Sequence, residues 1–599
     1  MSLRVPRIAP VAAAAAALIA AHLAVRAVVA FGGYFYWDDL ILVGRSGTQP
    51  LLSAQYLLTD HDGHVMPAAF LLGGVITRLA PLVWTWPAVS LLVLQLLAST
   101  ALLRALWVIL GWRPVLLVPL CFALFTPMAV PGFAWWTAGL NSLPMLAALA
   151  VVCAEAILLV RTGNGRHAVT AMLAYLTGLL FFEKAAVIPF VAFSVVTLVY
   201  YVHGGLPGGL SAVHRAWRDG IRLWVPALVL TAAWTALYLM LVDQRRWSSD
   251  LTMTWDLLRR SVTHGILPAL VGGPWQWQRW APASPWATPP TAATVLGAAA
   301  LAVAVAISLL RKQRVWAVWL VAAGYAAASQ VPIYLMRSSE FTALELAQTL
   351  RYLPDLVWVL AILAAVGLSA PNRAGPGWLD AGPRRTAVVS AAAVAFIASS
   401  LVSTATFLSS WRDSPTKPYL HNAIRGLAQA RAVSPAPLLD QEVDPLVLNR
   451  VVGPQNLASH LFALIRDRPE FAGSTDQLRM LDAAGHVVDA EVTWVRAVLP
   501  GPRPRCGYFL QPDEPVSLPM DGPLLPAEWT AEINYLANTD GTMRLSLPVG
   551  TPTRVPVKPG LNRVYVRLSG AGQQIAVQAE TAALAVCLAS GPVGYLAPR

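Results

Sequence analysis

The chain has 599 residues, of which 56% are hydrophobic and only 12% are charged, and its mean hydropathy is +0.57. A soluble protein of this size has about a quarter of its residues charged, so the composition excludes a wholly soluble globular protein. Charges are scarce between residues 8 and 410, whereas residues 412–599 have an ordinary soluble composition. The sequence therefore predicts a membrane part followed by a part in water.

The formal net charge of +12 does not indicate a nucleic-acid-binding protein. Much of the excess lies in short segments between apolar runs, where basic residues set the orientation of a membrane protein. The soluble part of the sequence has no stripe of Lys and Arg interleaved with aromatic residues. We therefore expect the lipid bilayer, and no nucleic acid, as a partner.

Eleven apolar runs are long enough to cross the hydrocarbon core of a bilayer, if short or tilted helices are allowed. They fall near residues 8–31, 84–110, 114–130, 142–160, 168–182, 185–202, 223–242, 291–310, 315–335, 352–370 and 386–408. The first run resembles a signal peptide, but it reaches about 24 residues and many spans follow, so we interpret it as an uncleaved span. The predicted fold is an α-helical polytopic membrane protein with about eleven transmembrane helices.

The distribution of basic residues predicts how the chain is oriented. With the N-terminus in the cytoplasm, every inside segment is basic and nearly free of acidic residues, as the positive-inside rule requires. The residues concerned are Arg4, Arg7, Arg113, Arg161, Arg166, Arg215, Arg218, Arg222, Arg311, Lys312, Arg314, Arg373, Arg384 and Arg385. We therefore predict a bacterial membrane protein with a cytoplasmic N-terminus, an extracytoplasmic C-terminal region and two long outer loops, 32–66 and 243–290.

The chain changes character at about residue 411, which ends the predicted transmembrane domain, 1–411. Residues 412–500 mix helical periodicity with short strand-like stretches and predict an α/β segment. Residues 501–599 alternate apolar and polar positions between turn residues, which predicts an antiparallel β-sandwich. Cys506 and Cys587 both fall in strand-like stretches here, and a disulfide between them is expected if this region is extracytoplasmic.

The first outer loop contains an adjacent acidic pair, Asp38 and Asp39, in the sequence FGGYFYWDDLILVG. Two carboxylates at the mouth of a span need water, a cation or a polar partner. In a cavity, such a pair can act as a general base or hold a divalent metal ion. The alternative is a solvated helix cap, because Asp is a favoured capping residue.

The same loop continues LLTDHDGHVMP, with four potential ligands or proton carriers in the segment 60–64. These are Asp60, His61, Asp62 and His64. Imidazole and carboxylate groups bind Zn or Mn, and a candidate metal set is Asp38, Asp39 and His64, with Mg or Mn as the ion. The spacing matches no dedicated metal motif, so an ordinary Asp-rich turn is the alternative, with Asp62 and His64 lining a substrate site.

Charged residues further along the chain are the remaining candidates. Glu183 and Lys184 form an acidic–basic pair near a membrane boundary, which favours either a functional group or a neutralising pair at a hairpin tip. Arg337 and Arg351-Tyr352 lie at the outer ends of two predicted spans. Arg is the natural binder of phosphate, since it is always charged and forms two parallel hydrogen bonds; interfacial anchoring is the alternative.

This arrangement resembles the GT-C superfamily of integral-membrane glycosyltransferases. The resemblance rests on the first span, the acidic pair opening a long outer loop, the second long loop and the outward C-terminal domain. The Trp37-Asp38-Asp39 motif followed by Gly63-His64-Val65-Met66-Pro67 also resembles a group of bacterial membrane proteins related to this superfamily. The final sandwich is similar to carbohydrate-binding regions of cell-wall arabinosyltransferases.

The resemblance implies transfer of a sugar, with inversion, from a polyprenyl-phosphate carrier to an envelope or cell-wall glycan acceptor on the outer face. It implies that Asp38 or Asp39 is the catalytic base, and Asp38 is narrowly favoured. It also implies that Arg337 and Arg351 contact the carrier phosphate, and that Glu183 or Asp62 assists the acceptor or a metal ion. No cofactor other than a candidate Mg or Mn ion is implied.

Two other classes of function stay open at this point. A transporter or flippase of a lipid-linked substrate predicts charged or broken spans near the midplane, and a non-enzymatic glycan-binding membrane protein leaves the acidic pair without a role. Only four of the 43 basic residues are Lys, and Ala and Pro are abundant. This usage is typical of a GC-rich bacterial genome and favours an actinobacterial envelope as the setting.

Overall fold

The computed structural model describes residues 10–204, 208–243, 250–339, 342–373, 383–512 and 514–599, so Arg4 and Arg7 lie outside the described residues. The chain forms two compact units. The first contains residues 1–42 and 49–414, and the second contains residues 43–48 and 415–599. Each unit is described by itself.

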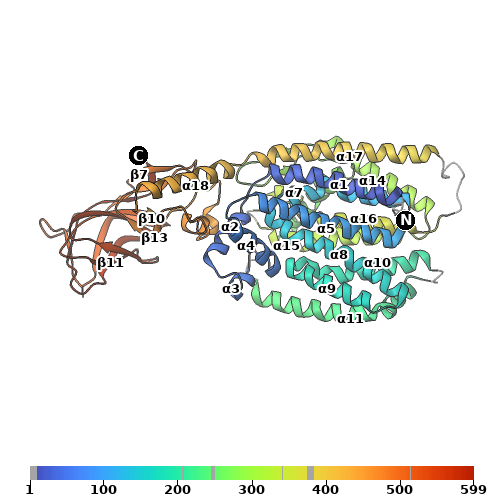
Figure 1. Ribbon diagram of the computed structural model, residues 1–599, viewed down its shortest axis with the longest axis horizontal. Coiled ribbons are helices and arrows are strands. Elements are labelled where there is room, and N and C mark those ends of the chain that lie inside the picture. The colour runs from blue at the N-terminus through green and yellow to red at the C-terminus, as the bar shows by residue number, and fades with distance from the viewer. Residues whose placement is uncertain (1–9, 205–207, 244–249, 340–341, 374–382, 513) are drawn as a thin grey trace, which may run out of the picture. The chain divides into compact units, whose positions relative to one another are not determined.

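The first unit is a bundle of helices (Figure 1). Its longer helices are α1 (Pro10–Gly32), α2 (Asp38–Thr48), which continues into the second unit, α4 (Pro67–Leu79), α5 (Thr85–Leu110), α6 (Leu117–Phe125), α8 (Trp136–Thr162), α9 (Arg166–Phe181), α10 (Ile188–His203), α11 (Gly209–Leu241), α12 (Leu251–Arg260), α14 (Thr291–Arg311), α15 (Trp316–Arg337), α16 (Pro354–Ser369) and α17 (Pro383–Arg412). Short elements between them include α3 (Ala54–Leu57), α7 (Val130–Ala134), α13 (Leu267–Ala269), the 3-10 helices Glu183–Val187 and Leu344–Thr349, and a hairpin of β1 (Trp277–Gln278) and β2 (Trp286–Ala287).

The described part of the chain has eight helices long and apolar enough to cross a membrane, or nine if a bent pair is one span. The bent pair is Pro114–Phe125 with Pro127–Ala134, which meet at 45° where Pro127 interrupts the helix. Each of the eleven predicted runs falls on a helix, but α9 and α16 have only 16 residues each. The membrane-embedded helical fold is confirmed, whereas the count of about eleven spans stays a prediction.

Burial within the bundle separates a central helix from peripheral ones. In α8, 78% of the most apolar window is buried against other helices, chiefly α5 and α9. In α14 the corresponding fraction is 11%, although this helix is more apolar than most. Apolar side chains left uncovered on this scale are stable only against lipid, so α14 lies at the lipid-facing rim and α8 forms the core.

Several basic residues predicted to be cytoplasmic lie together at one end of the bundle. The Arg161 Nη1 group donates to the carbonyl of Val108, and Arg314 Nη1 donates to the carbonyls of Tyr201 and Gly204. These contacts place cations at the C-terminal ends of α5 and α10, where the helix dipole favours positive charge. The orientation of the chain in the membrane stays a prediction.

The second unit combines a helical segment with antiparallel strands. Its helices are α18 (Thr416–Val433) and α19 (Ala458–Leu461). Its strands are β3 (Leu438–Leu439), β4 (Phe471–Ala472), β5 (Ser474–Thr475), β6 (Arg479–Leu481), β7 (Val487–Val492), β8 (Arg496–Ala497), β9 (Tyr508–Leu510), β10 (Val516–Ala537), β11 (Gly541–Ser546), β12 (Thr553–Val557), β13 (Gly560–Ala579), β14 (Val586–Leu588), β15 (Pro592–Gly594) and β16 (Leu596–Pro598). Strands of the 412–500 segment pair with later ones, for example β5 with β13 and β16 with β7, so the two segments share one unit.

The predicted alternation of residues 501–599 produces seven strands, β9 to β15, which join β5 and β8 in one nine-stranded sheet over an apolar core. The two long strands β10 and β13 lie in the middle of this sheet and pair antiparallel along most of their length. The register shifts twice between Pro519 and Ala527, where Gly and Pro interrupt β10 and where Gly570 and Gly572 of β13 have positive φ. Such interruptions let a long strand bend and contribute to both layers of a folded sheet.

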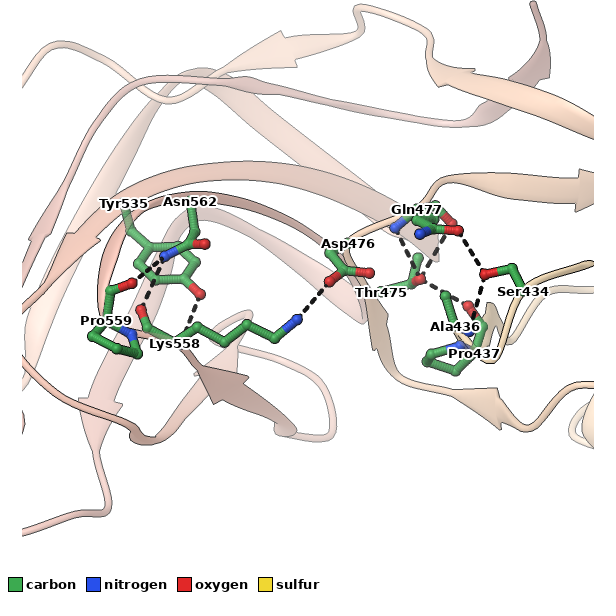
Figure 2. A network of polar contacts seen from close by, with 10 residues as sticks. All are labelled: Ser434, Ala436, Pro437, Thr475, Asp476, Gln477, Tyr535, Lys558, Pro559 and Asn562. Atoms are coloured by element: carbon green, nitrogen blue, oxygen red, sulfur yellow. Dashed lines mark hydrogen bonds and ion pairs between the residues drawn. The ribbon is translucent and has the colours of Figure 1, made fainter.

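Polar contacts join the 412–500 segment to the sheet (Figure 2). The Lys558 ammonium donates to Asp476 at 2.7 Å, and the backbone N–H of Lys558 donates to the Tyr535 hydroxyl. Nearby, the Thr475 hydroxyl donates to the Pro437 carbonyl at 2.7 Å. These contacts fix the strand-like segment around residues 475–477 against the sheet.

A disulfide joins Cys506 to Cys587, as the sequence predicted, while Cys121 and Cys153 are buried free thiols. The bond closes a loop of 81 residues, which restricts the unfolded chain. We expect replacement of both Cys506 and Cys587 by Ala to reduce the free energy of unfolding of the second unit by about 2–4 kcal/mol. Thermal unfolding of the full chain in detergent measures this loss. Alkylation of all four thiols in denatured, unreduced protein would contradict the disulfide.

Candidate active site

Asp39 is sealed into the protein at the start of α2. Its side chain has no solvent exposure, and each oxygen accepts a backbone hydrogen bond. Oδ2 accepts from the N–H of Tyr36 at 2.9 Å, and Oδ1 accepts from the N–H of Thr137, in the first turn of α8, at 2.9 Å. Asp39 thus accepts from backbone N–H groups as a capping residue does, but it is buried and not the solvated cap of the alternative; it ties the first loop to the first turn of α8.

Asp38 points elsewhere, and its side chain is 29% exposed. Trp37 before it has a φ of 43°, a left-handed conformation that is strained for a bulky residue. With Asp39 held on α8, the neighbouring carboxylate of Asp38 faces His61 of the first outer loop instead. The pair that looks uniform in sequence therefore contains one structural and one accessible carboxylate.

Two histidines follow on a tight turn and each faces a different carboxylate. The His61 Nε2 atom lies 3.6 Å from Asp38 Oδ1, and His64 Nδ1 lies 2.7 Å from Glu183 Oε1. Burial opposes ionisation of Asp38, but the interaction with His61 and the charges of His61, Arg351 and His64 outweigh it, so the pKa of Asp38 lies below its ordinary value. Asp38 is thus an ionised acceptor at neutral pH.

Arg337 and Arg351 both pack against the aromatic ring of Tyr352. The Cζ atoms of Arg351 and Arg337 lie 4.9 and 5.7 Å from the centroid of Tyr352. Arg351 also lies over Trp135, at 4.9 Å, and donates from Nη2 to the Tyr352 hydroxyl at 2.7 Å. Burial opposes the charge of Arg351, but Tyr352, Tyr36 and Asp38 raise its pKa. Arg351 is therefore a fixed cation within electrostatic reach of Asp38.

Glu183 and Lys184 do not pair with each other. Glu183 binds His64, whereas the Lys184 ammonium donates to Asp355 Oδ1 at 2.7 Å. The other Asp355 oxygen accepts from the Tyr325 hydroxyl at 2.7 Å. The alternative of a mutually neutralising pair is wrong, because Glu183 contacts His64 of the first outer loop whereas Lys184 contacts Asp355 of α16.

Several buried polar atoms at this end of the bundle have no hydrogen-bond partner within the described ranges, and three of them belong to or adjoin the candidate residues. These three are Arg351 Nε, Trp135 Nε1 and Glu183 Oε2. Two are donors and one is an acceptor. Buried polar groups are rarely left unpaired, so these atoms indicate a place for a polar ligand or ordered water. Asp62 contributes less: it is 67% exposed and contacts Arg337 at 3.5 Å.

The candidate metal set is not assembled. Asp39 has both oxygens on backbone N–H groups, and His64 Nδ1 faces Glu183. Across the described part of the chain, no three His, Cys, Asp or Glu side chains are grouped to hold a metal ion. The predicted set Asp38, Asp39 and His64 is therefore not brought together as a ligand group in the described residues. The candidate Mg or Mn requirement itself stays a prediction.

Sequence reasoning brought Asp38, His64, Glu183, Arg337, Arg351 and Tyr352 to one end of the bundle, and the structure places them there. It missed Trp135 and Tyr36. The Tyr36 ring lies 4.9 Å from Trp135, and burial raises the pKa of its hydroxyl to about 12. The aromatic run before Asp38 and the Trp135-Trp136 pair were the available signals, but aromatic residues at a membrane boundary are common.

No family model matches the chain, and no curated protein matches it. Solved structures that are similar to it include two of ArnT from Cupriavidus metallidurans. The structure bound to undecaprenyl phosphate has 14% identity and a TM-score of 0.40 and covers 76% of this chain and 85% of that one. The apo structure has 14% identity and a TM-score of 0.39, with 78% and 86% coverage. A TM-score below 0.5 falls short of a shared fold, so the proposals below rest on the site itself.

The burial of Asp39 makes a prediction about pH. Burial outweighs the backbone hydrogen bonds from Thr137 and Tyr36 and raises the pKa of Asp39 from an ordinary 3.8 to about 7. Between these values the folded state binds more protons than the unfolded state, so the stability contributed by Asp39 falls as pH rises. We expect the Tm of the wild type to fall relative to that of Asp39→Asn from about pH 4 to about pH 7. Parallel Tm curves for the two proteins would exclude this ionisation.

Proposed function

We propose that the chain is a GT-C-type membrane glycosyltransferase that moves a sugar, with inversion, from a polyprenyl-phosphate carrier to a glycan acceptor on the outer face. One observation carries this proposal. An ionised, accessible carboxylate, Asp38, lies within electrostatic reach of a fixed guanidinium, Arg351, at the end of a membrane bundle. A base and a cation are the minimum that such a transfer requires.

Asp38 is assigned as the base. The hydroxyl proton of the acceptor passes to an Asp38 oxygen while the acceptor oxygen forms a bond to the anomeric carbon. The bond between that carbon and the phosphate oxygen breaks, and the polyprenyl phosphate leaves with the electron pair. Asp39 cannot take this role, because both of its oxygens accept backbone hydrogen bonds and it has no exposure.

Arg351 and Arg337 are assigned to the carrier phosphate. Both guanidiniums pack against Tyr352, and Arg351 Nε has no hydrogen-bond partner in the part of the chain that is described. Trp135 offers a second unpaired donor beside Arg351. Donors held in place before the ligand arrives stabilise charge that develops on the departing phosphate. A site at the end of a bundle also lets the prenyl chain stay in lipid.

Glu183 is assigned to the acceptor. One of its oxygens is bound to His64, and the other is buried without a partner among the residues described. A second hydroxyl of a sugar acceptor donates to such an oxygen. This contact would orient the acceptor without taking part in proton transfer.

The second unit contains a cavity that favours a carbohydrate-binding role. Its volume is about 320 Å³, and its lining includes Tyr595, which is 40% exposed and stacks on Trp529 with 4.6 Å between ring centroids. Arg567, also in the lining, donates to Glu528 at 2.7 Å and to Asp440 at 3.2 Å. A flat aromatic face beside prearranged donors and acceptors suits the apolar face and hydroxyl groups of a neutral sugar.

The assignment of the base is tested with radiolabelled polyprenyl-phosphate sugars and bacterial envelope acceptors. We expect Asp38→Asn to reduce kcat by at least about 100-fold, because a general base typically contributes that much. Asp39→Asn is the matched control at the neighbouring position, and its folded protein should retain transfer. Undiminished transfer by Asp38→Asn would refute the base. Carrier depletion without product would favour transport instead.

The carbohydrate cavity is tested by binding alone. Tyr595→Ala should weaken binding of neutral envelope oligosaccharides to the full chain by about 10-fold or more, as expected for the loss of an aromatic stacking partner. Trp494→Ala is the control, because Trp494 is 70% exposed and lies outside the cavity lining. Isothermal titration calorimetry measures both. Equal losses in the two variants, or none in Tyr595→Ala, would contradict the site.

A further inference from the structure

The two histidines of the first outer loop belong to one rigid turn. His61 and His64 exchange backbone hydrogen bonds, N–H of each to the carbonyl of the other, at 3.1 and 3.0 Å. The two residues between them, Asp62 and Gly63, have φ values of 53° and 86°. Positive φ at both central positions is the pattern of a type I′ hairpin turn. Residues directly opposite each other in such a turn project their side chains to the same face.

Contacts from other parts of the first unit hold this turn in place. Asp60 Oδ1 accepts from the N–H of Gly63 at 2.7 Å, and its Oδ2 accepts from the N–H of Asp243 at 3.2 Å. The Tyr238 hydroxyl, at the end of α11, donates to the Gly63 carbonyl at 2.8 Å. The turn is therefore fixed from within the first loop and from the segment after α11.

The imidazole rings are held as well as the backbone. The His61 ring packs edge-on against Phe70 of α4 at 6.0 Å, and its side chain is 14% exposed. The His64 ring packs against Phe182 at 5.7 Å. Each ring then presents one nitrogen to a carboxylate from a separate segment: Asp38 of α2 for His61, and Glu183 for His64.

We propose that His61 is a positioning residue that orients Asp38 as the proton acceptor, and that the Asp60–His64 turn holds Asp38 and Glu183 in a fixed relation. This inference rests on the proposed transferase function, in which Asp38 accepts the proton of the acceptor hydroxyl. An imidazole beside a carboxylate aligns one oxygen and leaves the other for the substrate.

The charges around Asp38 agree with this role. Burial works against ionisation of Asp38, whereas the interaction with His61, 3.6 Å away, and the charges of Arg351 and His64 lower its pKa. Glu183 raises the pKa of His64 against the effect of burial, which favours a charged imidazole in the second pair. Removal of His61 takes away the nearest of these influences and leaves the others in place.

The test reads the protonation of Asp38 without using activity. Full-length protein in nanodiscs is treated with a water-soluble carbodiimide, which adds to protonated carboxyl groups, across a range of pH. Peptide mass spectrometry gives the pH at which half of Asp38 is labelled. We expect this midpoint to move to higher pH in His61→Asn, and to move less in His64→Asn.

A matched control is available at the opposite end of the bundle. His167 forms the same kind of pair with Glu155, in contact through Nδ1 and Oε2. His167→Asn should leave the Asp38 midpoint and the rate of transfer unchanged. The His61→Asn variant should also shift the acidic limb of the pH profile of kcat upwards, with little change in the KM for the donor.

The outcomes separate this inference from the proposed function. An unchanged Asp38 midpoint in His61→Asn, beside an inactive Asp38→Asn, would overturn the positioning role and leave the base in place. An upward shift in His61→Asn, beside full transfer by Asp38→Asn, would support the contact and refute the base. A shift of the same size in His167→Asn would show a general structural effect and would overturn the inference.

Discussion

The candidate active site depends on the hydrogen bonds that hold the Asp39 carboxylate. They join the loop before α2 to the first turn of α8, the most enclosed helix of the bundle. A buried carboxyl without these donors would be strongly unfavourable, so the contact fixes the position of α2 as well as satisfying Asp39. Because Asp39 is bound there, the strained turn at Trp37 directs Asp38 towards the histidines and Arg351. The buried carboxyl group of Asp39 thus determines where the accessible carboxylate of Asp38 lies.

The groups that hold the helices together differ from the groups that are available to a ligand. The groups with completed hydrogen bonds, such as Asp39, Lys184 and Asp355, lie towards the bundle and hold helices together. The groups with an unpaired atom, Arg351 and Glu183, lie where a ligand would complete them. Sites of this kind keep their geometry before the substrate binds, which is the requirement for electrostatic stabilisation of a transition state.

The sequence was sufficient for features that depend on composition and periodicity. Apolar runs coincide with each of the eight helices of the described residues that are long and apolar enough to cross a membrane, and strand alternation with two cysteines located the sheet and its disulfide. It could not separate Asp38 from Asp39, because their difference arises from a backbone N–H of Thr137 almost a hundred positions away. For the same reason it left open whether Glu183 and Lys184 neutralise each other. Partners brought together by tertiary packing leave no local pattern in a single sequence.

The central claim is that Asp38, Arg337 and Arg351 surround the reacting end of a lipid-linked sugar. A cryo-electron microscopy structure of the full chain in nanodiscs with added polyprenyl phosphate tests it most directly. The account predicts phosphate density within hydrogen-bond distance of Arg351 Nε and close to Arg337, with the prenyl chain extending into the lipid. Phosphate bound elsewhere on the bundle, with Arg351 still packed against Tyr352 and its Nε unpaired, would contradict the account.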